Sequence, residues 1–125
     1  MGLFKKEVKH ANDVSLGPEM DKLRDTFVHD FNVTKANISS GAVDEILKKI
    51  QKKCGLKNMK EAGAVFSVAA IEQQNAGQIS PELMWEPRIA LVRAVAMDRV
   101  YDDFGIERCR ELLEIARNLD LYSLD

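Results

Sequence analysis

The chain has 125 residues, a usual size for one domain with one compact core, and 18 Lys and Arg against 20 Asp and Glu give a net charge of −2. No run approaches the roughly 20 apolar residues of a membrane span, and the first residues lack the apolar stretch of a secretory signal. We therefore expect an intracellular or cytoplasmic protein, or a virion component, without a membrane span.

The small net charge conceals a division of charge along the chain. All eleven lysines lie in residues 1–60, and six of the seven arginines lie in residues 61–125. Counted with the acids, the first part carries +4 and the second −6. A divided field of this kind favours an anionic partner on one side, a cationic partner on the other, or head-to-tail contact between copies.

The first residues predict an arm followed by a helix. Residues 1–17 are the expected arm, with a short amphipathic stretch around Leu3, Phe4 and Val8. A Gly-Pro pair then opens a helix over 18–31, because proline is favoured in the first helical turn and apolar residues recur at helical spacing after it. The polar residues 32–39 are expected to form a link.

The second predicted helix begins after the candidate caps Ser39 and Ser40 and runs to Cys54, where Gly55 followed by an apolar residue is a usual helix stop. Its lysines lie opposite an apolar stripe, and acids of the first turn compensate part of their charge. The remaining cations are a candidate patch for an anionic partner, and the alternative is a solvated face. The patch consists of Lys52, Lys53, Lys57 and Lys60.

The third helix is predicted to start with a capping box at Asn58 and Glu61 and to reach about Gln74. It is apolar almost all round, which favours a central position in the domain, with an oligomer interface as the alternative. Gly63 would let a neighbouring helix approach closely, which would explain a residue that costs about 1 kcal/mol in a helix. A helix-turn-helix role is not expected, because the DNA-reading positions would be apolar.

The C-terminal half predicts a further capped turn at Ser80 and Pro81, an interruption at Pro87, a long helix to Gly105 and a last helix over about 106–118. On the long helix, Asp98 is expected on the solvent side. The fold class is thus all-α, an orthogonal or bundle-like domain of about five helices. Its expected parts are the arm 1–17, the domain 18–118 and an acidic tail 119–125.

Two arginines, Arg93 and Arg24, fall on apolar faces of their predicted helices. An unpaired buried guanidinium is costly, so each is expected to pair with an acid, to reach solvent along its stem, or to meet a partner subunit. The candidate acids are Glu61, Glu72 and Glu86.

No motif for catalysis, a cofactor or a metal is present, and Cys54 and Cys109 are expected to be reduced core residues. We therefore expect a non-enzymatic, self-associating structural or adaptor protein, such as a coat, filament or ring subunit. Its tail acids Asp120 and Asp125 would contact the lysine patch of a neighbouring copy.

Two alternatives stay open. One is binding of nucleic acid without sequence specificity, through contacts of the lysine patch with phosphates. The other is a small inhibitor or regulator of another protein that docks through its acidic C-terminal half. The acids of that surface are Asp102, Asp103, Glu111 and Glu114.

Overall fold

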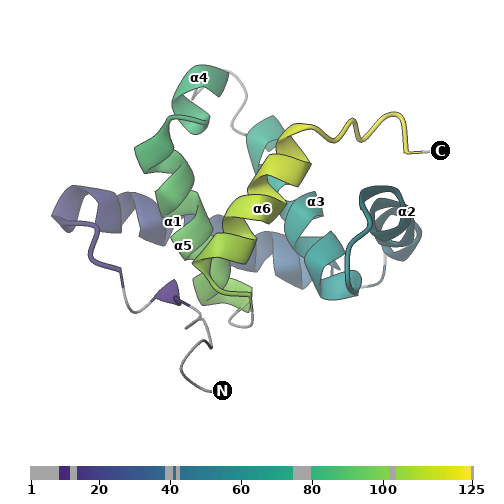
Figure 1. The fold of residues 1–125 in the computed structure, drawn as a ribbon, viewed down its shortest axis with the longest axis horizontal. Helices are drawn as coiled ribbons and strands as arrows, with labels where there is room; N and C mark the ends of the chain where they lie inside the picture. Colours follow the sequence, from purple (N-terminus) through teal and green to yellow (C-terminus); the bar gives the residue numbers. More distant parts are fainter. Residues whose placement is uncertain are drawn as a thin grey trace, which may run out of the picture.

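The fold is built from helices alone in the part of the chain that the computed structural model describes, which is residues 9–11, 14–38, 41, 43–74, 80–101 and 104–124. Five helices are long and one is a single turn, so the predicted all-α fold is confirmed (Figure 1). In chain order they are α1 (Pro18–Ile38), α2 (Asp44–Cys54), α3 (Met59–Gln74), α4 (Pro81–Met84), α5 (Pro87–Tyr101) and α6 (Ile106–Arg117).

Helix ends follow the local signals of the sequence. Gly55 ends α2 in the left-handed region at φ 64°, and the Leu56 N–H donates to the Gln51 carbonyl at 3.0 Å, as in a glycine helix stop. The Ser80 hydroxyl accepts a hydrogen bond from the Leu83 N–H at 3.3 Å and caps α4.

The predictions made for residues 1–8, 39–40, 102–103 and 125 lie outside the residues that the structure describes.

The first helix is longer than predicted, because residues 32–38 belong to α1 rather than to a link. This segment has no glycine or proline to end the helix, and Lys35 gains tertiary contacts from its helical position. The Lys35 ammonium donates to the Val100 carbonyl at 3.2 Å and lies 5.1 Å from the centroid of the Tyr101 ring. Contact with α5 therefore extends α1 beyond its local signals.

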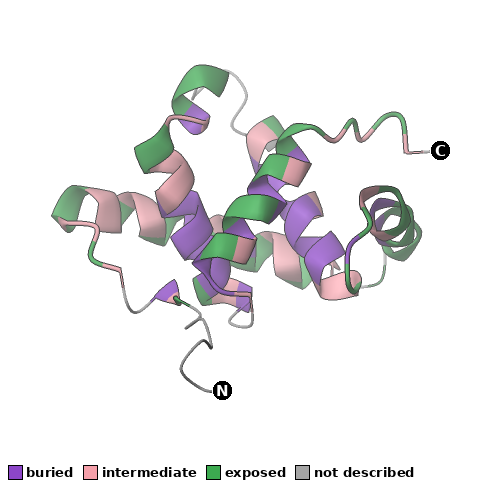
Figure 2. Cartoon of the chain, in the orientation of Figure 1, coloured by how far each residue is buried: buried purple, intermediate pink, exposed green. Residues whose placement is uncertain are grey.

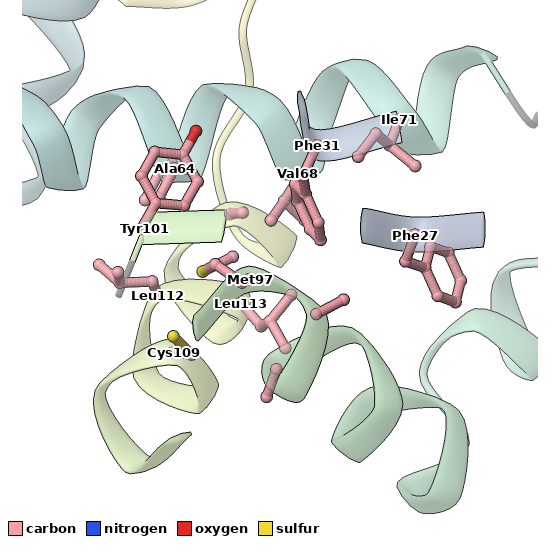
Figure 3. Close-up of a cluster of buried hydrophobic side chains, with 14 of the residues drawn as sticks. Phe27, Phe31, Ala64, Val68, Ile71, Met97, Tyr101, Cys109, Leu112 and Leu113 are labelled. Atoms are coloured by element: carbon pink, nitrogen blue, oxygen red, sulfur yellow. The ribbon is translucent and has the colours of Figure 1, made fainter. Parts of the chain in front are cut away.

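The core is centred on α3, as its apolar sequence predicts. This helix contacts α1, α2, α5 and α6, and Figure 2 shows it mostly buried. Figure 3 shows side chains of α1, α3, α5 and α6 meeting in one cluster, with Val68, Phe31 and Met97 near its middle. The chain itself therefore covers most of the apolar surface of α3.

The glycine within α3 does not serve a close approach of two helices, and that expectation was wrong. A Cβ atom added at Gly63 would lie 3.9 Å from Ile38 Cδ1, which is an ordinary van der Waals distance. The position therefore has room for alanine.

The solvent position expected for Asp98 was also wrong, because this carboxylate is 1% exposed. It accepts backbone hydrogen bonds from Ala11 at 2.7 Å and Gly105 at 2.8 Å, and His10 Nδ1 lies 3.2 Å from Oδ2. The Ile106 N–H donates to the Lys9 carbonyl at 2.8 Å beside it. Asp98 thus joins the arm, α5 and the start of α6.

Replacing Gly63 by alanine should stabilise the fold by about 0.5–1 kcal/mol, because alanine loses less backbone entropy in a helix. Urea unfolding followed by circular dichroism measures the change. As the matched control, Gly55→Ala should destabilise the fold, since Gly55 has a positive φ. A destabilised Gly63→Ala variant would contradict the packing described.

Replacing Asp98 by asparagine should cost about 2–4 kcal/mol, because an amide NH₂ would face a buried backbone N–H that now donates to the carboxylate. The same unfolding experiment measures this loss. The exposed Glu107 on α6 provides the control, and Glu107→Gln should change stability by less than about 0.5 kcal/mol. Equal midpoints for the two variants would show that Asp98 has no such role.

Candidate functional site

The lysines predicted as an anion patch lie at the C-terminal end of α2 and at the start of α3. Lys52, Lys53 and Lys57 are exposed, whereas Lys60 is half-buried. The Lys53 ammonium donates a hydrogen bond to the carbonyl of Ser123, and the Lys60 ammonium lies 5.9 Å from the centroid of the Phe104 ring. Two members of the patch therefore already contact other parts of the same chain.

Residues 118–124, here called the tail segment, leave the end of α6 and run toward α2 (Figure 1). The Lys53 contact holds the segment at α2, and Gln73 Nε2 donates to the Tyr122 hydroxyl at 3.1 Å and holds it at α3. Its leucines are partly buried against the core. The Asp120 carboxylate accepts a hydrogen bond from the Tyr122 N–H at 2.9 Å, which forms a turn within the segment.

Hollows flank the tail segment. One of about 320 Å³ lies between the segment and α2, and we call it the tail groove. Its lining residues are Ile46, Lys49, Phe66, Gln73, Leu121, Tyr122 and Leu124. A second hollow of about 270 Å³ lies toward α6 and is lined in part by Ala116 and Arg117. Ile46 and Tyr122, with 37% and 88% exposure, leave apolar surface at the tail groove.

The structure buries Arg93 completely, at 1% exposure, as its position on an apolar helix face predicts. Its Nη1 donates to the Met84 carbonyl at 3.0 Å, and its guanidinium lies 4.6 Å from the centroid of the Trp85 ring. The Nε and Nη2 atoms have no hydrogen-bond partner in the described structure. Burial lowers the pKa of Arg93 to about 10, which leaves the side chain cationic at neutral pH.

The acids expected beside Arg93 are arranged differently from the prediction. Glu72 lies near enough for its charge to favour the protonated form of Arg93, but its Oε1 accepts a hydrogen bond from Trp85 Nε1 at 2.9 Å. Glu86 accepts from the backbone N–H of Arg88 at 3.2 Å. The Arg117 guanidinium also lies over the Trp85 ring, at 5.0 Å from its centroid. The cluster therefore brings two cations and Glu72 together around one indole.

The other arginine predicted on an apolar face is Arg24 of α1, and its side chain is 17% exposed. It pairs with acids of its own helix, since its Nη1 lies 3.0 Å from Asp21 Oδ1 and its Nη2 lies 3.0 Å from Asp25 Oδ1. Arg24 is thus paired, as expected, although with local acids rather than with Glu61 or Glu72.

The partner of Glu61 is Arg108 on α6. Arg108 Nε and Nη2 donate to the two carboxylate oxygens at 2.9 and 2.8 Å, and Glu61 also accepts from the Lys57 N–H at 3.0 Å. Hydrogen bonding to Arg108 is the main cause that lowers the pKa of Glu61, and the pair raises the pKa of Arg108 in turn. Glu61 thus links α3 to α6.

Sequence reasoning missed Arg108. The signal that identifies it is its place four residues before Leu112, on the margin of the buried stripe of α6.

Two of the acids proposed as a docking surface have their negative charge partly compensated by arginines of the same helix. Glu111 lies 3.2 Å from Arg108, and Glu114 lies 3.8 Å from Arg117.

The cysteines and His29 differ in their surroundings. Cys54 and Cys109 are both free thiols. Burial, with a contribution from the charge of Asp98, raises the pKa of Cys109, which keeps it protonated. His29 is exposed on α1. Within the described ranges, no group of three or more His, Cys, Asp or Glu residues could hold a metal ion.

None of the helices in the described part of the chain combines the length and apolarity needed to cross a bilayer. Comparison with protein-family models, with curated proteins and with solved structures finds no match to this chain.

The Glu61 pair predicts a pH-dependent stability. Because the folded-state pKa of Glu61 lies below its ordinary value of 4.5, the pair stabilises the fold above that pH, and the contribution is lost as pH falls through the folded pKa. Glu61→Gln should therefore cost about 1–3 kcal/mol at pH 7 and clearly less at pH 3. Urea midpoints of both proteins at the two pH values measure the difference, and a cost independent of pH would refute the assignment.

Proposed function

We propose that this chain is a non-enzymatic assembly protein whose tail segment binds the tail groove of a second copy. In this view the chain is a self-associating subunit of a coat, filament, ring or adaptor assembly. The observation that supports the proposal is the position of the tail segment, which lies against α2 and α3 of its own chain and forms one wall of the tail groove.

The groove and the segment are complementary in chemistry. Ile46 and Phe66 supply apolar surface, and Lys49 and Lys53 supply cations at α2. The tail segment offers leucines, a tyrosine and the acid Asp120. An apolar segment with an acidic residue is the ligand expected for an apolar groove beside lysines, because burial gives affinity and charge gives orientation.

Exchange between copies needs no new interface. The same contacts form within one chain or between two chains, as in other cases of domain swapping. The hollows beside the segment, of about 320 and 270 Å³, leave room for a partner to improve the packing. Because a groove on one copy and a tail on another form a heterologous contact, repeated exchange builds rings or open filaments.

The protein concentration should decide whether the tail segment binds within its own chain or to a second copy. A tethered segment competes with an effective concentration in the millimolar range, so the intrachain contact dominates in dilute solution. Contact between chains is favoured when copies are concentrated or held together on a scaffold. The contact between chains is therefore little populated in dilute solution and becomes populated within an assembly.

The test is sedimentation equilibrium of the wild type and of a Leu121→Ser/Leu124→Ser double variant over a range of protein concentrations. The wild type should increase in mean mass with concentration, and the double variant should stay monomeric, because it lacks the apolar anchors of the tail segment. Val33→Ser is the matched control, since Val33 is an apolar residue of α1 with 49% exposure that does not line the groove.

The proposal fails if the wild type is monomeric at every concentration, or if the double variant associates like the wild type. The nucleic-acid alternative makes a separate prediction, which is binding to any polyanion with an affinity that falls steeply as salt increases. Lys52→Glu/Lys57→Glu should abolish that binding and leave the concentration dependence of the mass in place.

A further inference from the structure

The unpaired atoms of Arg93 form one complete recognition edge. In a guanidinium group the Nε and Nη2 hydrogens point in parallel from the same side of the plane, and this edge binds a carboxylate through two hydrogen bonds. In Arg93 both atoms are buried and without a partner, while the remaining nitrogen, Nη1, donates to the Met84 carbonyl.

Such an edge is rarely left unoccupied. Buried polar groups in folded proteins nearly always have hydrogen-bond partners, and a buried cation in particular requires compensation. Arg93 carries its charge at neutral pH, because its pKa remains near 10. The guanidinium carbon lies over the Trp85 ring, 4.6 Å from its centroid, but an indole has no oxygen or nitrogen acceptor that could take the two hydrogen bonds.

The neighbours favour an additional anion of low charge. Glu72 is the acid whose charge acts on Arg93, but Trp85 Nε1 already donates to it. Arg117, whose guanidinium lies 5.0 Å from the centroid of the same indole ring, adds a second cation. Glu72 and a monoanionic carboxylate would together balance the positive charges of Arg93 and Arg117. A dianionic phosphate would be repelled more strongly by Glu72.

We propose that the Nε/Nη2 edge of Arg93 is a binding site for a carboxylate, supplied either by a small organic acid or by an Asp or Glu side chain of a second copy. The ligand reaches the edge through local opening of the segment 80–85, which supplies the Met84 carbonyl and the Trp85 ring that contact Arg93. Within that segment α4 is a single turn and Leu83 is 50% exposed, whereas Met84 is buried in the core, so the opening costs the burial of Met84 and lowers the affinity for the ligand accordingly.

Trp85 is the only tryptophan of the chain, and its fluorescence reports on this site. We would titrate the protein with sodium acetate and sodium formate, with sodium chloride at matched ionic strength as the reference salt. The wild type should show a saturable change with each carboxylate and none with chloride. Each tenfold increase of acetate beyond its dissociation constant should also raise Tm by about 5 °C.

Two variants separate the recognition edge from charge alone. Arg93→Lys keeps the cation but lacks the parallel donors, and it should lose the response to acetate. Arg117→Gln removes the neighbouring charge and keeps the edge, so the response should persist with an affinity reduced by less than about tenfold. If Arg93→Lys does not fold, the Nε–H resonance of Arg93 in the wild type serves instead, and it should shift with acetate and not with chloride.

The concentration dependence of the protein alone distinguishes the source of the carboxylate. A fluorescence change on concentrating the protein without acetate identifies a side chain of a second copy, and a change that requires added acid identifies a small ligand. Leu121→Ser/Leu124→Ser should leave the acetate response intact, which separates this site from the tail groove. The inference is overturned if chloride and acetate act alike, if Arg93→Lys responds like the wild type, or if neither fluorescence nor the Nε–H resonance responds to acetate.

Discussion

The arrangement of the C-terminal half depends on one buried carboxylate. Asp98 accepts backbone N–H groups from Ala11 in the arm and from Gly105 before α6, so one side chain fixes three parts of the chain. Once α6 is fixed, Arg108 reaches Glu61 on α3, and the chain leaves α6 in the direction of α2. These contacts lie at the opposite end of α6 from the tail groove.

Local signals predicted much of this fold, and contacts between distant residues account for the errors. The ends of α2 and α4 were predictable because their caps involve residues a few positions apart. The end of α1 was not, because Lys35 is held by α5. The burial of Asp98 was not predictable from its helix, since one of its partners lies 87 positions away and is a backbone group without a sequence pattern.

For the candidate sites too, local patterns predicted exposure and burial but not the contacts between distant residues. Helical periodicity predicted the exposure of the α2 lysines and the burial of Arg93. It did not predict that an indole and a carbonyl, rather than a carboxylate, would contact Arg93, because these neighbours come from the last residue of α4 and the residue that follows it. The tail groove combines α2, α3 and the tail segment, so periodicity within one helix could not reveal it.

The central claim is that the tail segment binds the same groove within a chain and between chains. Isotope-filtered NOE spectroscopy on a mixture of labelled and unlabelled protein tests it directly, through contacts between the Tyr122 ring and the Ile46 methyl groups, which line one groove. The account predicts intrachain contacts in dilute solution and interchain contacts that grow with concentration. Contacts that remain intrachain at the highest concentration reached would contradict it.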